Sequence, residues 1–131
     1  MFAEFMDTLA IEDRPHFIGE LAERFDVSLR TLRFWEEKGL ITPDRDHARN
    51  RYYTATEVAR IAFVVDCRRV GMAVDDIRDL LADRRSLATA DFRDRVRHAL
   101  ERRRTEIDAE IAERHAQKDA TARWIATLMD A

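Results

Sequence analysis

The segment from Ile18 to Gly39 constrains the fold of this chain most, because it predicts two short helices joined by a tight turn. Its first half carries an apolar stripe at helical spacing, formed by Ile18, Leu21, Ala22 and Phe25. Ser28 is a good N-cap for the second helix, and Asp26 lies where the turn needs a residue tolerant of unusual backbone angles. Gly39 ends the second helix. We therefore expect a helix-turn-helix.

The second helix of this pair would expose a polar face with two arginines near its start. Leu29 and Leu32 are expected to face inward. The outward set is Arg30, Thr31 and Arg33. An arginine near the start of a helix can bring its guanidinium to base edges in the major groove of DNA. In an isolated helix, ordinary solvated side chains would be the better interpretation, but the segments that follow favour DNA recognition.

Positive charge is concentrated locally, in the middle of the first two thirds of the chain, although the formal net charge is -3 at pH 7. Between Val27 and Val70, nine Arg or Lys residues stand against six Asp or Glu. This modest excess supports a nucleic-acid surface without establishing one. With 131 residues, the chain has room for one small core and one long appendage.

The stretch from Leu40 to Tyr53 is rich in turn-forming residues and predicts a small hairpin, or wing. Its cations are Arg45, Arg49 and Arg51, which are suited to gripping DNA phosphates from a protruding loop. Two tyrosines close the stretch. We expect one ring in the core and the other facing outward, and the pattern does not say which.

Two more helices are expected after the wing, the first capped by Thr56 and ended by Gly71. Its core residues would be Val58, Ile61, Ala62 and Val65. The second would follow Asp75 and Asp76 and bury Ile77, Leu80 and Leu81. Arg68 and Arg69 near the end of the first allow two equal interpretations: a second wing reaching DNA, or stabilisation of the helix dipole.

The chain resembles the DNA-binding domain of the MerR family of bacterial transcription regulators. Three segments in succession carry this resemblance: the helix pair, the basic wing ending in RYY, and TEVARIAFVVDCRRVGMAVDDIRDLL. The resemblance covers residues 17–83. It implies a mostly α fold, with a winged helix-turn-helix DNA-binding domain over residues 16–85. A long antiparallel coiled-coil dimerisation helix would follow. It also implies a homodimer that binds a near-palindromic operator in double-stranded DNA. This dimer would distort the operator between two promoter elements so that RNA polymerase can use them.

The resemblance can be carried over position by position. The recognition-helix residues are Arg30, Thr31 and Arg33, preceded by the cap Ser28. Phe34 and Trp35, which also belong to the predicted DNA-contacting set, stand where many members have two tyrosines whose hydroxyls could reach phosphate. Of the two, only the Trp indole can still donate a hydrogen bond. The wing residues are Arg49, Arg51 and Tyr53. Two glycines frequent in the family are replaced, one in the wing sequence HARNRYY and one by Asp26.

Residues 90–129 contain no Gly or Pro and predict one long helix. Its apolar stripe continues from Phe92 into the predicted dimerisation residues Val96, Leu100, Ile107 and Ile111. With a short C-terminal tail, this region would form a second domain over residues 86–131. The apolar end around Trp124 is expected to dock on the partner subunit, with a small-molecule cage as the less favoured alternative.

Several function classes find no support in the sequence. It has no glycine-rich phosphate loop or nucleophile elbow, so we expect no enzyme and no cofactor. Cys67 lies in an apolar run and the four histidines are dispersed, so we expect a buried thiol and no metal site. Without a membrane span or signal peptide, a cytoplasmic protein is expected. Residues 1–15 form an extension with helical apolar spacing, expected to pack on the chain or a second subunit.

The favoured function is a dimeric, sequence-specific transcription regulator that binds double-stranded DNA. An architectural or excisionase-like DNA-bending protein is the first alternative, and a protein-interaction adaptor built on a helix-turn-helix scaffold is the second. The operator, the direction of regulation and any small-molecule effector are left open.

Overall fold

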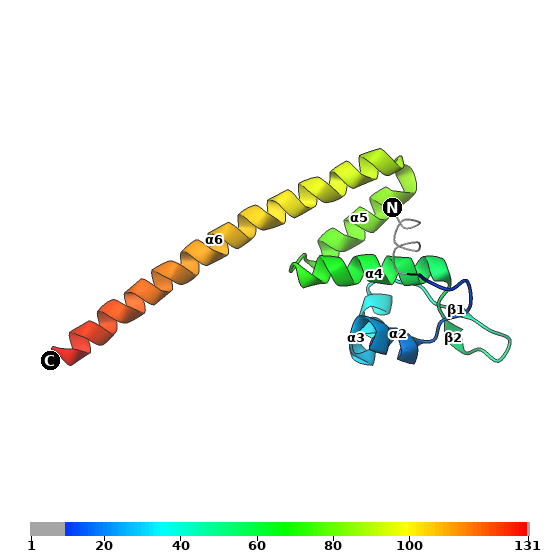
Figure 1. Cartoon of the computed structure of the whole chain (residues 1–131), viewed down its shortest axis with the longest axis horizontal. Helices are drawn as coiled ribbons and strands as arrows, with labels where there is room; N and C mark the ends of the chain where they lie inside the picture. Colours follow the sequence, from blue (N-terminus) through cyan, green and yellow to red (C-terminus); the bar gives the residue numbers. More distant parts are fainter. Residues whose placement is uncertain (1–9, 131) are drawn as a thin grey trace. The chain divides into compact units, whose positions relative to one another are not determined.

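The computed structural model describes residues 10–130, apart from the side chains of residues 85 and 86. It is mostly helical, as predicted, and its elements run in the order α2, α3, β1, β2, α4, α5 and α6 (Figure 1). The chain divides into two compact units between Asp94 and Arg95, and each is described by itself. The apolar residues of the predicted N-terminal helix lie at positions 2–9, outside the described residues.

The predicted helix-turn-helix is formed by α2 (Ile18–Phe25) and α3 (Leu29–Glu37). Asp26 has a φ of 51°, so the turn uses the left-handed backbone expected there. Ser28 caps α3, because its hydroxyl accepts a hydrogen bond from the backbone N–H of Thr31 at 3.0 Å. The expectation that Leu29 faces inward is wrong: it is the first residue of α3 and remains 41% exposed.

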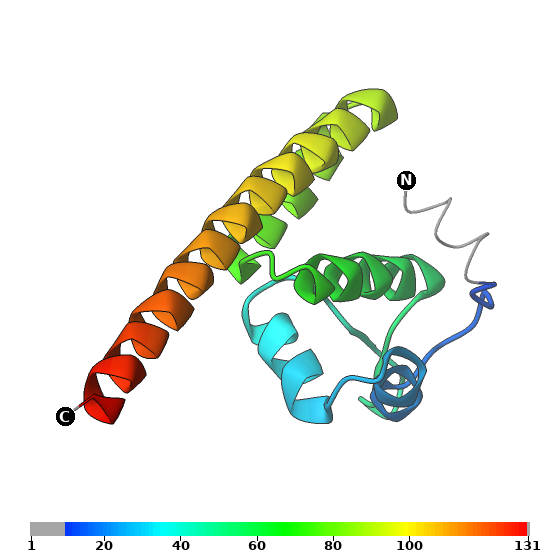
Figure 2. The ribbon, with the colours of Figure 1, turned by 60° about the vertical axis from the view of Figure 1, so that its left-hand side comes forward.

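Helix α4 (Ala55–Arg69) is the centre of the core, and α2 and α3 lie on the same side of it (Figures 1 and 2). The predicted cap at Thr56 is wrong, because the hydroxyl of Thr54 accepts the backbone N–H of Glu57 at 3.2 Å. The earlier start brings Ala55 into the helix and the core, whereas Thr56 is exposed. The predicted core positions of α4 are buried.

Helix α5 (Val74–Ser86) follows a turn in which Gly71 has a φ of 79°. It buries Ile77, Leu80 and Leu81, as predicted. Phe92, in the first turns of α6, is also buried, and its ring centroid lies 6.0 Å from that of Phe63 in α4. These contacts complete the core of the first unit.

The predicted wing is a two-stranded antiparallel hairpin of β1 (Asp44–Arg45) and β2 (Arg51–Tyr52). Asp46 closes its loop, because its side chain accepts the backbone N–H of Asn50 at 2.8 Å. Arg49 has a φ of 64° and so occupies the left-handed conformation that a wing glycine would adopt more easily. The hydrogen bond to the Asp46 side chain therefore helps to hold the wing turn, which a glycine at position 49 would form more easily.

Helix α6 (Thr89–Met129) is the long helix predicted from the absence of Gly and Pro. In the second unit it carries many charged side chains, with ion pairs along the helix such as Arg103 to Glu110 at 2.9 Å. Apolar side chains remain exposed along it, including Leu100 at 42% and Ile111 at 50%. Within residues 10–130, no helix has the length and apolar character needed to cross a membrane.

Candidate DNA interface

The exposed face of α3 carries two arginines. Arg30 and Arg33 are both exposed, and among the described residues no carboxylate lies within 4.0 Å of either guanidinium. Ser28 is exposed as well, and its hydroxyl donates to the Thr31 hydroxyl at 2.8 Å. The cap therefore holds the start of α3 rigidly while the guanidinium groups stay available to an anionic partner.

The two aromatic residues of α3 have opposite environments. Trp35 is 3% exposed and lies with Leu32 on the buried face, three residues apart. Its assignment as a DNA-contacting residue is therefore wrong in this structure, since the indole is used in the core. Phe34 is 42% exposed, and the Lys38 ammonium lies 5.6 Å from its ring centroid. Phe34 is thus the aromatic residue available at the surface.

An ion pair ties the wing to α3. Arg51 in β2 donates to the carboxylate of Glu36 in α3 at 3.2 Å, and the arginine side chain remains 42% exposed. Its neighbour across the hairpin is Arg45, whose guanidinium donates to the backbone carbonyl of Arg49 at 3.1 Å. The side chain of Arg49 is exposed in the loop. These bonds position a cationic hairpin relative to α3 without covering its charge.

Tyr53 is the tyrosine that belongs to the core. It has no exposed surface, and its backbone pairs with His16 through two hydrogen bonds of 2.7 and 2.9 Å. Burial, with a further contribution from Glu36, raises the pKa of its hydroxyl above the ordinary value of 10.0. The assignment of Tyr53 to the DNA-contacting set is wrong, because a fully buried ring cannot reach DNA. The outward tyrosine is Tyr52, which is half-buried.

Arg68 and Arg69 lie in the last turn of α4, and both are exposed. Arg68 donates to the backbone carbonyl of Met72 at 2.7 Å, which stabilises the chain reversal before α5. Arg69 forms an ion pair of 3.4 Å with Asp66 one turn earlier. Both side chains therefore have a structural contact, and both still present guanidinium surface on the same unit as α3.

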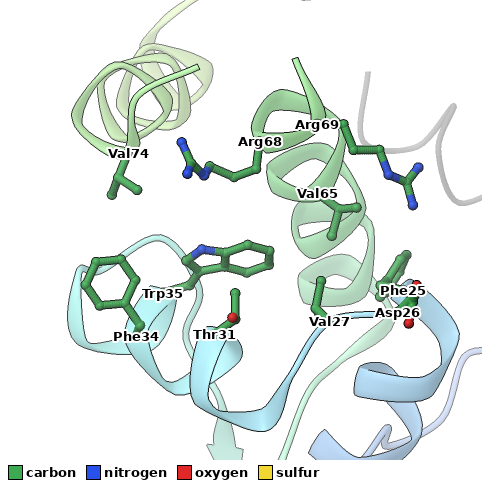
Figure 3. Close-up of a pocket in the computed structure, with 10 residues that line it drawn as sticks. All are labelled: Phe25, Asp26, Val27, Thr31, Phe34, Trp35, Val65, Arg68, Arg69 and Val74. Atoms are coloured by element: carbon green, nitrogen blue, oxygen red, sulfur yellow. The ribbon is translucent and has the colours of Figure 1, made fainter. Parts of the chain in front are cut away.

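A cavity of about 460 Å³ lies between α3, the turn that precedes it and the end of α4 (Figure 3). Its lining includes Thr31, Phe34 and Trp35 from α3 and Arg68 and Arg69 from α4. A further bond fixes the end of α3: Arg78 of α5 donates to the backbone carbonyl of Lys38 at 3.0 Å. No sequence signal links these residues, because they are far apart along the chain and meet only through packing.

Two family models match the chain. The model for the MerR HTH family regulatory protein matches residues 17–84, and the model described as MerR, DNA binding, matches residues 58–128. The chain belongs to the MerR family. Its family and relatives are transcription regulators rather than enzymes.

Individual relatives of this MerR-family chain agree with that assignment. The HTH-type transcriptional regulator HmrR of Rhizobium leguminosarum bv. viciae is 39% identical over 98 residues, which cover 73% of each chain. Other curated regulators match over 49% of this chain and 45% of their own length.

Solved structures agree as well. The regulator PbrR691 from Ralstonia metallidurans CH34, crystallised with lead(II), has a TM-score of 0.56 and 31% identity, covering 79% of this chain and 83% of its own. HiNmlR, a MerR-family regulator lacking the sensor domain and bound to promoter DNA, shares the fold with a TM-score of 0.58 and 23% identity. That alignment covers 90% of this chain and 93% of HiNmlR.

The thiol of this MerR-family chain is protected. Cys67 is 4% exposed in α4, and burial together with Asp66 raises its pKa to about 12. A thiol that stays protonated at neutral pH is a poor nucleophile and a poor metal ligand. Among residues 10–130, no group of three or more His, Cys, Asp or Glu side chains is arranged to hold a metal ion.

Proposed function

We propose that this MerR-family regulator binds a near-palindromic DNA operator as a homodimer, with α3 in the major groove and the wing on the phosphate backbone. The observation that carries the proposal is the exposed start of α3, where Arg30 and Arg33 have no carboxylate partner within the described residues. A guanidinium can form two parallel hydrogen bonds with a guanine edge, so these two residues would supply base recognition.

The wing would contribute to the affinity for DNA rather than to sequence specificity. Arg45 and Arg49 lie on an exposed hairpin, which is suited to phosphate contacts and to the release of bound counterions. Arg51 would exchange its exposed contact with Glu36 for a phosphate, and such an exposed pair contributes little stability. Arg68 and Arg69 would add contacts from the far side of α3.

Dimerisation would use the apolar stripe of α6. Val96 is only 8% exposed in the single chain, so the exposed part of the predicted seam begins at Leu100 and continues through Ile107 and Ile111. An antiparallel pairing of two such helices would bury these side chains and place the two α3 helices in two half-sites. In this arrangement the apolar end around Trp124, which is 71% exposed, would dock on the partner subunit.

The dimer would act on transcription by deforming its operator. Bending and untwisting a site of 20–30 base pairs costs on the order of 1–6 kcal/mol, which contacts from both α3 and the wing must offset. Such a change can realign promoter elements for RNA polymerase. A regulator of chromosomal promoters would act in the bacterial cytoplasm, and an effector is not required by this proposal.

The test of DNA recognition is selection of random duplex DNA by the purified protein at moderate salt. We expect two inverted half-sites at fixed spacing. On the selected operator, Arg30→Ala should cost about 1–3 kcal/mol and relax one base position, whereas Arg49→Ala should weaken all sequences and lower the salt slope by about 1. Arg114→Ala, which removes one charge from α6, is the control. Unchanged affinity in both test variants would overturn the α3 and wing assignments.

The dimer is tested separately by light scattering. Combined Leu100→Asp and Ile107→Asp changes should produce monomers, because four buried carboxylates would face one another at the seam. Ala109→Asp with Ala116→Asp adds the same charge to the opposite side of α6, given 100° of rotation per residue. This control should stay dimeric, and a dimer in the Leu100 and Ile107 variant would contradict the proposed interface.

A further inference from the structure

We propose that the cavity between α3, α4 and the start of α5 is a binding site for a small planar aromatic anion, such as an aromatic carboxylate. Its volume of about 460 Å³ lies within the range of ligand pockets in proteins, about 300–1,000 Å³. This inference goes beyond the proposed DNA recognition and does not depend on it.

The floor of the cavity is aromatic. Phe34 and Trp35, consecutive residues of α3, both line it, and Figure 3 shows their rings next to each other below Val74 and Arg68. Trp35 is held in place by the core, whereas Phe34 is 42% exposed and can cover an incoming ring. A flat aromatic ligand would therefore pack mainly against the exposed ring of Phe34, with offset or edge-to-face geometry, while the buried Trp35 forms a fixed part of the wall beside it.

The polar end of the cavity selects a negative charge. The guanidinium of Arg68 lies above the rings, on the side to which the Trp35 indole nitrogen is directed (Figure 3). Arg68 is held by its bond to the Met72 carbonyl, and within residues 10–130 no carboxylate lies within 4.0 Å of it. Its remaining N–H groups can donate to a carboxylate, and a fixed donor loses little freedom on binding.

The opposite end of the cavity is closer to neutral. Arg69 and Asp26 both line that end, and Arg69 forms an ion pair of 3.4 Å with Asp66, so this end carries charges of both signs. A cationic ligand would be repelled by Arg68 at one end, and an uncharged ligand would give its guanidinium no negative charge to pair with. An aromatic ring with one anionic group therefore fits the lining best.

Binding here would also affect the proposed function. Arg68 belongs to the proposed DNA-contacting set, so a ligand bound to its guanidinium would take that cation away from the DNA phosphates. Thr31 and Phe34 belong to α3, so the ligand would also lie against the helix proposed to enter the major groove. We expect the ligand to weaken operator binding. This second effect rests on the proposed function, whereas binding of the ligand itself is measured without DNA.

The experiment is a nuclear magnetic resonance titration of the full chain, following its two indole N–H signals. The spectrum of Trp124→Phe identifies the Trp35 signal. The probes are 2-naphthoate and its neutral isostere 2-naphthamide. We expect naphthoate to shift the Trp35 signal saturably, with at least about tenfold higher affinity than the amide, because a hydrogen bond to a charged group is lost in the amide.

Arg68→Met should remove this preference between the two probes, whereas Arg33→Met, a charge loss outside the cavity, should preserve it. Equal affinities for the two probes, or no saturable shift at Trp35, would overturn the proposal. The comparison of probes needs no variant in the cavity, so a folding defect in Arg68→Met would leave the result readable. A ligand that binds but does not affect operator affinity would contradict only the second effect.

Discussion

Replacing Tyr53 by Phe should stabilise this protein. The ring of Tyr53 has no exposed surface, and its hydroxyl oxygen is buried without a hydrogen-bond partner among the described residues. An unpaired buried hydroxyl costs about 1–3 kcal/mol in proteins, and the small space left by its removal costs a few tenths of a kcal/mol. The free energy of unfolding should therefore rise by about 1–2 kcal/mol, because phenylalanine keeps the ring and removes only the unpaired group.

Urea unfolding at fixed protein concentration measures this change. With a urea slope of about 1–3 kcal/mol/M, a gain of 1 kcal/mol raises the midpoint by roughly 0.3–1 M. Tyr52→Phe is the matched control on the neighbouring, half-buried ring, and should change stability by less than about 0.5 kcal/mol. A loss of stability in Tyr53→Phe would mean that the hydroxyl is bonded. A loss of operator affinity at unchanged stability would restore Tyr53 as a DNA contact.

The pH dependence of the same pair gives an independent check. Burial raises the pKa of the Tyr53 hydroxyl in the folded state above its ordinary value of 10.0, so the folded state favours the protonated hydroxyl. The contribution of this protonated form to the free energy of unfolding is fully present below pH 10 and is lost as pH rises through the folded pKa. The stability of the natural protein should therefore fall relative to Tyr53→Phe above pH 10. Parallel curves for the two proteins would contradict the burial argument.

Three further predictions concern the first unit. Ser28→Ala should lower the free energy of unfolding by about 1 kcal/mol, because it removes the hydroxyl that caps the backbone N–H of Thr31. Thermal unfolding measures this loss, and an unchanged stability would rule out the cap. Cys67 should react with a thiol reagent only on unfolding, so fast labelling of the folded protein would contradict its raised pKa. The carboxyl of Glu20 should titrate near pH 2, because Arg14 donates to it, and should return toward its ordinary value in Arg14→Met, as followed by nuclear magnetic resonance.

Local signals predicted the elements well where their cause lies within a few residues. The cap at Ser28 and the left-handed turn at Asp26 depend on bonds between close neighbours, so the sequence is enough to place them. The same limit explains the wrong prediction of a cap at Thr56, since either of two threonines two residues apart can cap a helix. Which of them does so is decided by the burial of Ala55.

The candidate interface was only partly predictable for a related reason. Periodicity identifies a polar face on α3, and both arginines predicted there are exposed. It cannot separate Phe34 from Trp35, because adjacent residues in a helix differ by only 100° and either can lie at the edge of the buried stripe. The ion pair between Arg51 and Glu36 joins residues 15 apart, which no local pattern indicates.

The helix-turn-helix, the turn-rich wing and the long helix follow from local sequence, because apolar spacing, caps and the absence of Gly and Pro act over one or two turns of chain. The pairing of Tyr53 with His16 in the core and the cavity between α3 and α4 depend instead on contacts between distant segments. Those outcomes depend on which distant surfaces exclude water together, and this is set by packing of the whole unit rather than by neighbours in sequence.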